Sequence, residues 1–369
     1  MAVLSRPPPR AAGRHARTGR AAAALLVLER PGRAWAALLV GIALVWVALQ
    51  RVTLGLRPTF LGKDYAQLAL DPFHPSADNP VGHRLLAPLV SWAMGLRGPY
   101  LLYMNLLATV VLLGAVYLWF RGRGHAPTWA VYGASIAALS MVALTTLHYG
   151  GYPDAFTYLL VFGAWLVRRH PAAAAALFLA AMLAHESALF LAPWLGIEIA
   201  RATGGAHRGW RAAAAVGAAV VAFSAARVAL EAWHPGVSYT FRFYATPLLH
   251  DPLHWFRESA GSRGLGIAAA FDLYWLFPAL AAARMWVRGH RADAVVLLMP
   301  VACALAQLVI AYDTTRMATL AFPSVLLGAE YLLRVDGWAA RRWALPLALA
   351  NFFLPQVNVA MGIVDRMGR

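Results

Sequence analysis

The stretch YLLYMNLLATVVLLGAVYLWF, from Tyr100 to Phe120, holds no charged residue and is followed at once by Arg121 and Arg123. An α-helix rises about 1.5 Å per residue, so about 20 apolar residues cross the roughly 30 Å hydrocarbon core of a bilayer. The stretch therefore predicts a membrane-spanning helix. The whole chain of 369 residues has the same character, with 61% hydrophobic and 13% charged residues, whereas about 25% of the residues in soluble domains are charged.

Further apolar segments are separated by short polar or arginine-containing loops. Together they predict an all-α, polytopic bundle of about 10–11 membrane segments, with non-cytoplasmic loops and interfacial helices. The segment at 85–96 is too short for a full span and predicts a re-entrant or surface-lying helix. The segments lie at residues 34–54, 85–96, 128–147, 155–167, 172–200, 212–230, 265–287, 294–311, 317–333 and 343–363.

The distribution of positive charge predicts an orientation. The net charge is +16, but the arginines stand in small clusters between apolar segments, which favours loops beside anionic lipid over a nucleic-acid site. If residues 172–200 make two short passes that fold back at His185-Glu186, most of the 32 basic residues fall on the cytoplasmic side, as the positive-inside rule requires. If they make one pass, the later loops invert.

This orientation starts from residues 1–30, whose composition predicts a disordered, basic cytoplasmic tail, and residues 31–369 are predicted to form a single transmembrane domain. Arginine is abundant while Lys63 is the one lysine, a bias typical of GC-rich bacterial genomes. We therefore expect an integral, multi-pass protein of the bacterial inner (plasma) membrane with a cytoplasmic N-terminus. Cys303 is the one cysteine, which excludes an intramolecular disulfide and a cysteine-based metal site.

The polar stretch GKDYAQLALDPFHPSADNPVGHRLLAP, from Gly62 to Pro88, is the densest group of ionisable residues near the first span. Ionisable side chains at a membrane boundary need water, one another or a ligand, so such a group is a candidate site. The predicted topology places it on the non-cytoplasmic side with four other polar segments: His148–Asp154, His185-Glu186, the loop at 231–263, and Tyr312–Arg316. We expect these segments to form one polar crevice.

Each candidate residue also has a purely structural interpretation. Asp64 is alternatively an ordinary solvated loop carboxylate, and Arg84, beside His83, alternatively extends to lipid headgroups. His148 and Asp154 flank Gly150-Gly151 and alternatively stabilise that turn.

The same alternatives hold for the later candidates. Asp313 and Arg316, at positions i and i+3, alternatively form a salt bridge at a helix start. The adjacent pair His185-Glu186 is the hardest to explain structurally, because it lies among Ala, Leu and Phe.

The layout resembles the GT-C superfamily of integral-membrane glycosyltransferases. In that family a first span is followed by a non-cytoplasmic loop with an acidic motif, and then by interfacial segments and many spans. Asp64-Tyr65 in GKDYAQLA stands where the family's loop acid stands, and His83-Arg84-Leu-Leu-Ala-Pro88 is similar to the polar entry to the next helix. The two-acid form of that motif is missing, since Lys63 and Tyr65 flank Asp64, and this leaves a requirement for a divalent metal ion open.

The resemblance implies a sugar donor linked to polyprenyl phosphate and presented from the membrane lipid. It implies Asp64 as the base, assisted by Asp154 or Glu186, because transfer needs deprotonation of the acceptor hydroxyl. Arg84 and Arg316 would hold the donor phosphate. The remaining substrate-binding candidates are His83, His148, His185 and Asp313.

Two other function classes fit the same residues. An intramembrane metal-dependent hydrolase would bind Zn²⁺ through His148, Asp154, His185 and Asp313. A proton-coupled transporter or lipid flippase would use acids such as Glu186 as a proton path. The sequence does not identify the sugar, the acceptor or the oligomeric state.

Overall fold

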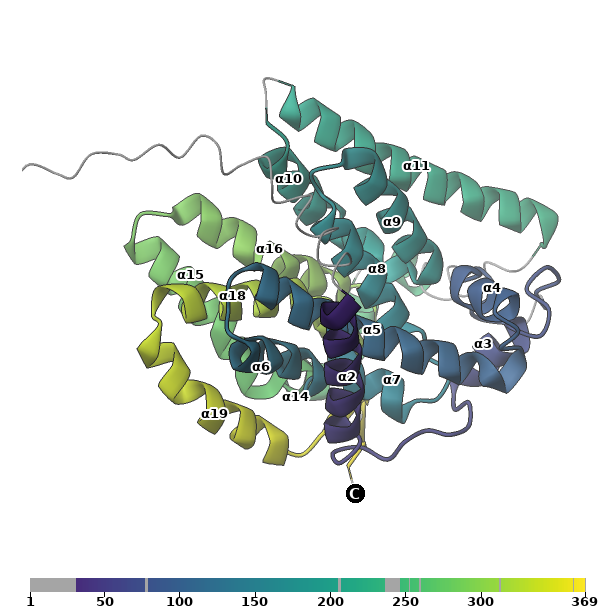
Figure 1. Cartoon of the computed structure of the whole chain (residues 1–369). Coiled ribbons are helices and arrows are strands. Elements are labelled where there is room, and N and C mark those ends of the chain that lie inside the picture. Colours follow the sequence, from purple (N-terminus) through teal and green to yellow (C-terminus); the bar gives the residue numbers. More distant parts are fainter. Residues whose placement is uncertain are drawn as a thin grey trace, which may run out of the picture.

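The computed structural model describes residues 31–76, 79–204, 207–235, 246–251, 253–258, 260–311, 313–360 and 362–368. The predicted tail at 1–30 lies outside these residues. The described chain is mostly helical, which confirms the predicted α-helical class (Figure 1).

The first group of helices precedes the longest one. It comprises α2 (Pro31–Ala48), α3 (Leu61–Leu68), α4 (Leu86–Ala93), η1 (Gly98–Tyr100), α5 (Leu101–Gly122), α6 (Pro127–Ala138), α7 (Met141–His148), α8 (Asp154–Leu166), α9 (Pro171–Ala184), η2 (Glu186–Leu191) and α10 (Ala192–Ala202).

The second group begins with the longest helix and ends in a hairpin. It comprises α11 (Arg208–Trp233), α13 (His254–Glu258), α14 (Ala260–Phe271), η3 (Asp272–Trp275), α15 (Leu276–Val287), α16 (Arg291–Gln307), α17 (Thr314–Thr319), α18 (Phe322–Val335), α19 (Trp338–Phe353), β1 (Val357–Ala360) and β2 (Ile363–Arg366).

Three helical stretches of the described residues are long and apolar enough to cross a membrane: Gly98–Gly122, Arg208–Trp233 and Ala260–Val287. The opening stretch, Tyr100–Phe120, lies within the first of them. A fourth candidate is the pair α6 and α7, which bends by 52° at its break. The other apolar helices are shorter, so length and composition identify fewer spans than the predicted 10–11.

Several helices expose large apolar side chains, and α2 and α11 show this clearly. Helix α2 exposes Trp35 and Trp46, and α11 exposes Trp210, Val228 and Trp233. Only 17% of the most apolar window of α11 is buried, and the helix lies along the edge of the molecule (Figure 1). Apolar surface of this extent marks contact with another apolar phase or partner.

Helices α2 and α5 pack closely through glycines. A Cβ atom added at Gly41 would stand 2.4 Å from the carbonyl oxygen of Val110, and one added at Gly114 would stand 2.9 Å from that of Ala37. Small residues at a crossing let two helix backbones approach each other, which is common among helices in lipid.

The segment 172–200 breaks at His185, as predicted. Helix α9 ends at Ala184, His185 is extended (φ −157°, ψ 120°), and η2 begins at Glu186. Arg168 and Arg169, before α9, line the same cavity as Arg201 after it. The chain therefore returns to the end of the bundle from which it came.

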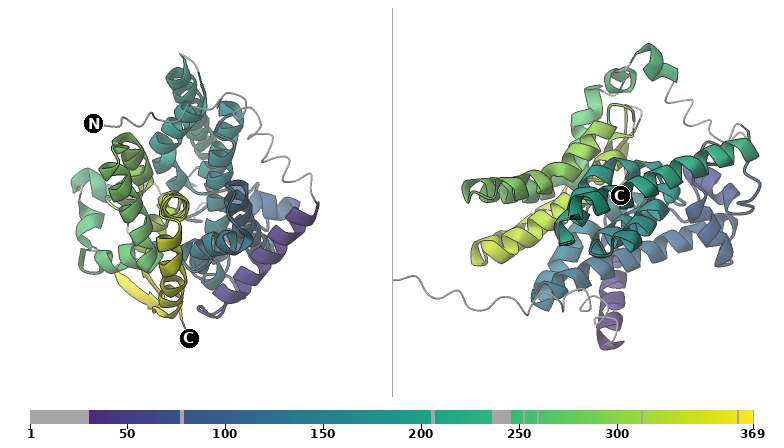
Figure 2. Two further views of the ribbon diagram at one scale, coloured as in Figure 1. Left: turned by 60° about the vertical axis from the view of Figure 1, so that its left-hand side comes forward. Right: turned by 90° about the horizontal axis from the view of Figure 1, so that it is seen from above.

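The predicted last span, Trp343–Ile363, is wrong. Helix α19 ends at Phe353, and β1 and β2 form an antiparallel hairpin with Val357 opposite Arg366. Pro355 disfavours helical backbone at Leu354, whose ψ is 141°. The hairpin lies near the C-terminus (Figure 2), and the backbone N–H of Val359 donates to Thr315 Oγ1 at 2.8 Å. It therefore supports α17, which carries Arg316.

Candidate functional site

Six of the nine candidate residues form two clusters in which an arginine pairs with one or two carboxylates, and a seventh, His185, lies beside them. The first cluster is built around Glu186, the first residue of η2. Arg84 donates from Nε to Glu186 Oε2 at 2.7 Å and from Nη2 to Oε1. His83 Nε2 lies 3.3 Å from Oε2 of the same carboxylate. Arg84 Nη1 also donates to the hydroxyl of Tyr65 at 2.9 Å.

The solvent exposure of the side chains differs strongly within the first cluster. The Glu186 side chain is 31% exposed, whereas those of Arg84 and His83 are 6% and 2% exposed. Nδ1 of His83 is buried and has no hydrogen-bond partner among the described residues. Buried polar atoms are nearly always paired, so this nitrogen is free for a bound water or ligand.

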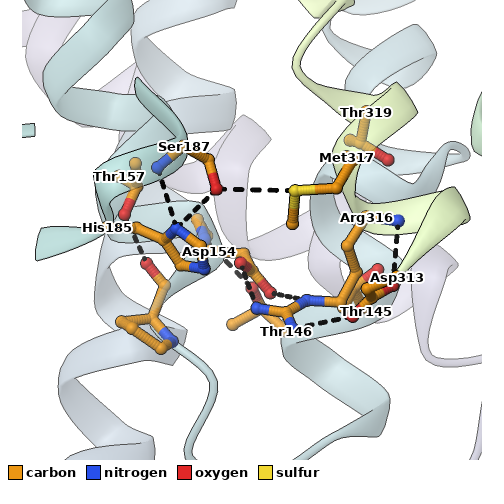
Figure 3. Close-up of polar contacts among 12 residues, drawn as sticks. Thr145, Thr146, Asp154, Thr157, His185, Ser187, Asp313, Arg316, Met317 and Thr319 are labelled. Atoms are coloured by element: carbon orange, nitrogen blue, oxygen red, sulfur yellow. Dashed lines mark hydrogen bonds and ion pairs between the residues drawn. The ribbon is translucent and has the colours of Figure 1, made fainter. Parts of the chain in front are cut away.

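The second cluster is built around Arg316 (Figure 3). Its Nε and Nη2 donate to the two carboxylate oxygens of Asp154 at 3.0 and 2.8 Å, and its Nη1 donates to Asp313 Oδ2 at 2.9 Å. The guanidinium lies 4.3 Å from the ring centre of Tyr152, a cation–π contact. Two carboxylates face one guanidinium here, so the cluster carries no surplus positive charge.

His185 lies next to the first cluster, with its Nδ1 3.9 Å from Glu186 Oε2, and Figure 3 shows His185 and Ser187 beside the second cluster. Nδ1 of His185 accepts the backbone N–H of Ser187 at 3.2 Å and lies 2.6 Å from its hydroxyl. Ser187 Oγ in turn lies 3.5 Å from the sulfur of Met317, which follows Arg316. The clusters are therefore parts of one connected polar region.

Electrostatics fix the charge state of the first cluster. Burial opposes ionisation of Glu186, but the charge of Arg84 and the hydrogen bond from His83 lower the pKa of its carboxyl well below the usual range. Burial and the charge of Arg84 lower the pKa of His185 to about 3. At neutral pH, Glu186 is an anion and His185 is a neutral acceptor at Nδ1.

A glycine turn positions α3 against the second cluster. A Cβ at Gly62 would stand 2.0 Å from the carbonyl oxygen of Gly150, and Gly151 has a φ of +96°. Only glycine allows such an approach and such a backbone angle without strain. The turn therefore places Asp64 and Tyr65, in the first turns of α3, beside the segment that leads into Tyr152 and Asp154.

The other two candidates lie outside the clusters. Nδ1 of His148 faces the carbonyl oxygen of Thr53 at 3.1 Å. Asp64 is partly exposed and, among the described residues, its carboxylate has no hydrogen-bond or ion-pair partner. Burial raises its pKa, against the opposing charge of Lys63. Asp64 is thus the one acid among the candidate residues that forms no ion pair with an arginine of the described chain.

Three residues of this region escaped the sequence-based prediction as ligands: Tyr65, Tyr152 and Arg227. Arg227, on α11, is close enough to Glu186 and Arg84 to interact electrostatically with both. Its position inside the predicted span 212–230 could have identified it from the sequence, because charged residues within membrane spans usually have a functional role.

The residues do not fit a metal site. Within the described ranges, no three His, Cys, Asp or Glu side chains are placed to hold one ion. Asp154 and Asp313 are already bound to Arg316, and His148 faces Thr53. The four ligands of the hypothetical zinc site are therefore not assembled.

Comparison of the chain with protein-family models, with curated proteins and with solved structures finds no match.

Proposed function

We propose that this chain is a polytopic membrane glycosyltransferase with a GT-C-like organisation, which transfers a sugar from a polyprenyl-phosphate donor to an acceptor on the non-cytoplasmic face. The observation that carries the proposal is Asp64, a partly exposed carboxylate with no ion-pair partner in the described part of the chain, on the helix whose Tyr65 contacts Arg84. The apolar surface of α2 and α11 supports a membrane location, with lipid-linked substrate supplied from the bilayer.

Asp64 has the properties of a general base. Its raised pKa makes the carboxylate a better proton acceptor, and no arginine competes for its oxygens. In the proposed reaction, Asp64 takes the proton of the acceptor hydroxyl while that oxygen attacks the anomeric carbon. The bond from this carbon to the phosphate oxygen breaks, and the polyprenyl phosphate leaves with the electron pair.

The number of carboxylates paired with each arginine indicates which arginine binds the donor phosphate. Arg84 pairs with one carboxylate, that of Glu186, which is 31% exposed, and Arg227 is close enough to interact electrostatically with Glu186 and with Glu231. Arg316 faces both Asp154 and Asp313. We therefore assign phosphate binding to Arg84 and Arg227 at the exposed edge of Glu186, and a positioning role to Arg316. Arg84 uses its three nitrogens in the contacts described, but a guanidinium has five N–H groups, so donors remain for a phosphate.

The test is transfer of radiolabelled sugar from polyprenyl-phosphate-linked donors to membrane acceptors by the purified, reconstituted protein. Asp64→Asn removes the base and should lower the rate by at least 100-fold, since general-base catalysis contributes about 10²–10⁴-fold. Asp71→Asn is the matched control, because Asp71 is an exposed loop acid paired with His74. In the active protein the rate should rise with pH as Asp64 ionises. Equal rates for Asp64→Asn and Asp71→Asn would exclude Asp64 as the base.

The metal-dependent hydrolase has less support, because its four ligands are not assembled. For the transporter alternative, the Glu186 carboxylate is held by Arg84 and its pKa is lowered, which disfavours protonation during a transport cycle. Uptake into liposomes that survives Asp64→Asn but is lost in Glu186→Gln would favour the transporter over the transferase.

A further inference from the structure

A cavity of about 1030 Å³ lies at the end of helix α8 that is opposite to the candidate site. It is lined where α5, α8, α10, α15 and α18 end and where α11 and α16 begin. Helix α8 separates it from the candidate site: Asp154 opens this helix of 13 residues, and Arg168 follows its end. At about 1.5 Å per residue, roughly 20 Å of helix lie between them. The cavity is therefore a different site.

The lining of the cavity has a large excess of positive charge. Seven arginines and three carboxylates contribute to it. They come from loops for which the sequence predicted one common side of the membrane. Such a concentration of guanidinium groups is repulsive unless carboxylates or a bound anion compensate it.

Each of the three carboxylates already forms an ion pair with an arginine. Glu198 accepts from Trp165 Nε1 at 2.8 Å and pairs with Arg168 at 3.2 Å. Asp293 pairs with Arg201. The third, Glu330, pairs at 3.4 Å with an arginine of its own helix, α18. No acid of the lining is left over for the remaining arginines.

Arg123, Arg169 and Arg208 are the arginines left without an acid. All three are exposed, and no carboxylate of the described residues lies within 4.0 Å of any of them. They come from the ends of α5 and α8 and the start of α11, which are distant in sequence. All three therefore contribute guanidinium N–H groups to the lining of one cavity.

Apolar side chains also line the cavity. Trp165, Leu297 and Leu327 belong to the lining, and the cavity is far larger than a single inorganic ion. Guanidinium groups bind phosphate oxygens in a fork geometry, and basic pockets between membrane helices bind the headgroups of anionic lipids. We propose that this cavity binds a phosphate-bearing group through Arg123, Arg169 and Arg208. The group comes either from an anionic phospholipid or from a soluble phosphate compound.

The experiment compares lipid and soluble probes on the full chain in neutral detergent. Native mass spectrometry measures retention of phosphatidylglycerol and phosphatidylcholine, and thermal unfolding measures stabilisation by pyrophosphate. The cavity variant is Arg169→Gln with Arg208→Gln. The matched control is Arg57→Gln with Arg97→Gln, which removes two exposed arginines outside the lining. Arg123→Gln alone is a milder cavity variant that keeps the test valid should the double variant unfold.

We expect the unmodified chain to retain at least tenfold more phosphatidylglycerol than phosphatidylcholine, and the cavity variant to lose most of this excess while the control keeps it. Stabilisation by pyrophosphate alone, lost only in the cavity variants, would support the site and identify a soluble ligand. Equal loss in cavity and control variants, or no loss in either, would overturn the proposal. Sugar transfer is not part of the readout, so the result is independent of the proposed transferase function.

Discussion

Arg316 binds both carboxylate oxygens of Asp154 through two parallel hydrogen bonds, although the residues lie 162 positions apart in the chain. Both side chains are about 95% buried. The pair joins the N-terminus of α8 to α17, so it connects the first and second groups of helices. A bidentate pair of this kind is stronger, and more specific in its geometry, than a salt bridge with a single hydrogen bond.

Breaking this pair should destabilise the fold. Asp154→Asn leaves Arg316 with only Asp313, and removal of one partner of a buried pair costs about 3–5 kcal/mol. Thermal unfolding in detergent should show a clearly lower midpoint. Asp293→Asn, in the half-exposed pair with Arg201, is the control and should cost less than about 1 kcal/mol. Similar midpoints for both variants would show that Arg316 and Asp154 contribute no more than a surface pair.

His185 should make the fold sensitive to mild acid. Its pKa is lowered from 6.5 to about 3, so the folded state resists protonation while the unfolded state accepts it. Stability should therefore be complete above about pH 6.5 and should fall as the pH drops from there toward 3. His185→Gln should lose less stability over this range, as followed by unfolding at a series of pH values. Parallel curves for both proteins would contradict a buried, neutral His185.

Tyr65 should hold Arg84 in place. Tyr65→Phe removes the hydroxyl that accepts from Arg84 Nη1, and a hydrogen bond to a charged group contributes about 1.5–3 kcal/mol. We expect a lower unfolding midpoint together with a higher KM for the donor, because Arg84 then loses its fixed orientation. Tyr103→Phe is matched in chemistry, since Tyr103 is exposed and stacks on Tyr100, and it should behave as the unmodified protein does.

Gly62 should not tolerate a side chain. The Cβ of Gly62→Ala would stand 2.0 Å from the carbonyl oxygen of Gly150, so α3 must move away from the turn. We expect reduced stability and loss of transfer activity. Gly217→Ala, in α11 with no atom within 4 Å of the new Cβ, should be neutral or stabilising by up to about 1 kcal/mol. Unfolding midpoints and transfer rates of the two variants test the difference, and an unaffected Gly62→Ala would refute the close approach.

Hydropathy and charge predicted much of the local organisation. The helix over Tyr100–Phe120 and the break at His185 follow from composition and from the cost of ionisable groups in an apolar run. The arginine clusters marked the loops that meet at the cavity. Hydropathy failed at Trp343–Ile363, because an average over the segment hides the effect of Pro355 on Leu354.

The candidate site was predicted as a set of residues rather than as an arrangement. Asp154, Glu186, Arg84 and Arg316 were identified, but which acid binds which arginine was not. The phosphate role predicted for Arg316 does not fit its two carboxylate partners, and Arg227 was missed. These contacts join residues 102 to 162 positions apart, and no local pattern encodes such pairings.

The sequence by itself determined that this chain forms apolar helices with most of its ionisable residues in the segments between them, because the solvation of side chains depends on residue type and spacing. Only the tertiary structure decided that Asp64 has no ion-pair partner among the described residues while arginines pair with Glu186, Asp154 and Asp313, and that Arg123, Arg169 and Arg208 converge on one cavity. Electrostatic pairing falls off over a few ångströms, so it is set by how the helices pack and not by their order in the chain.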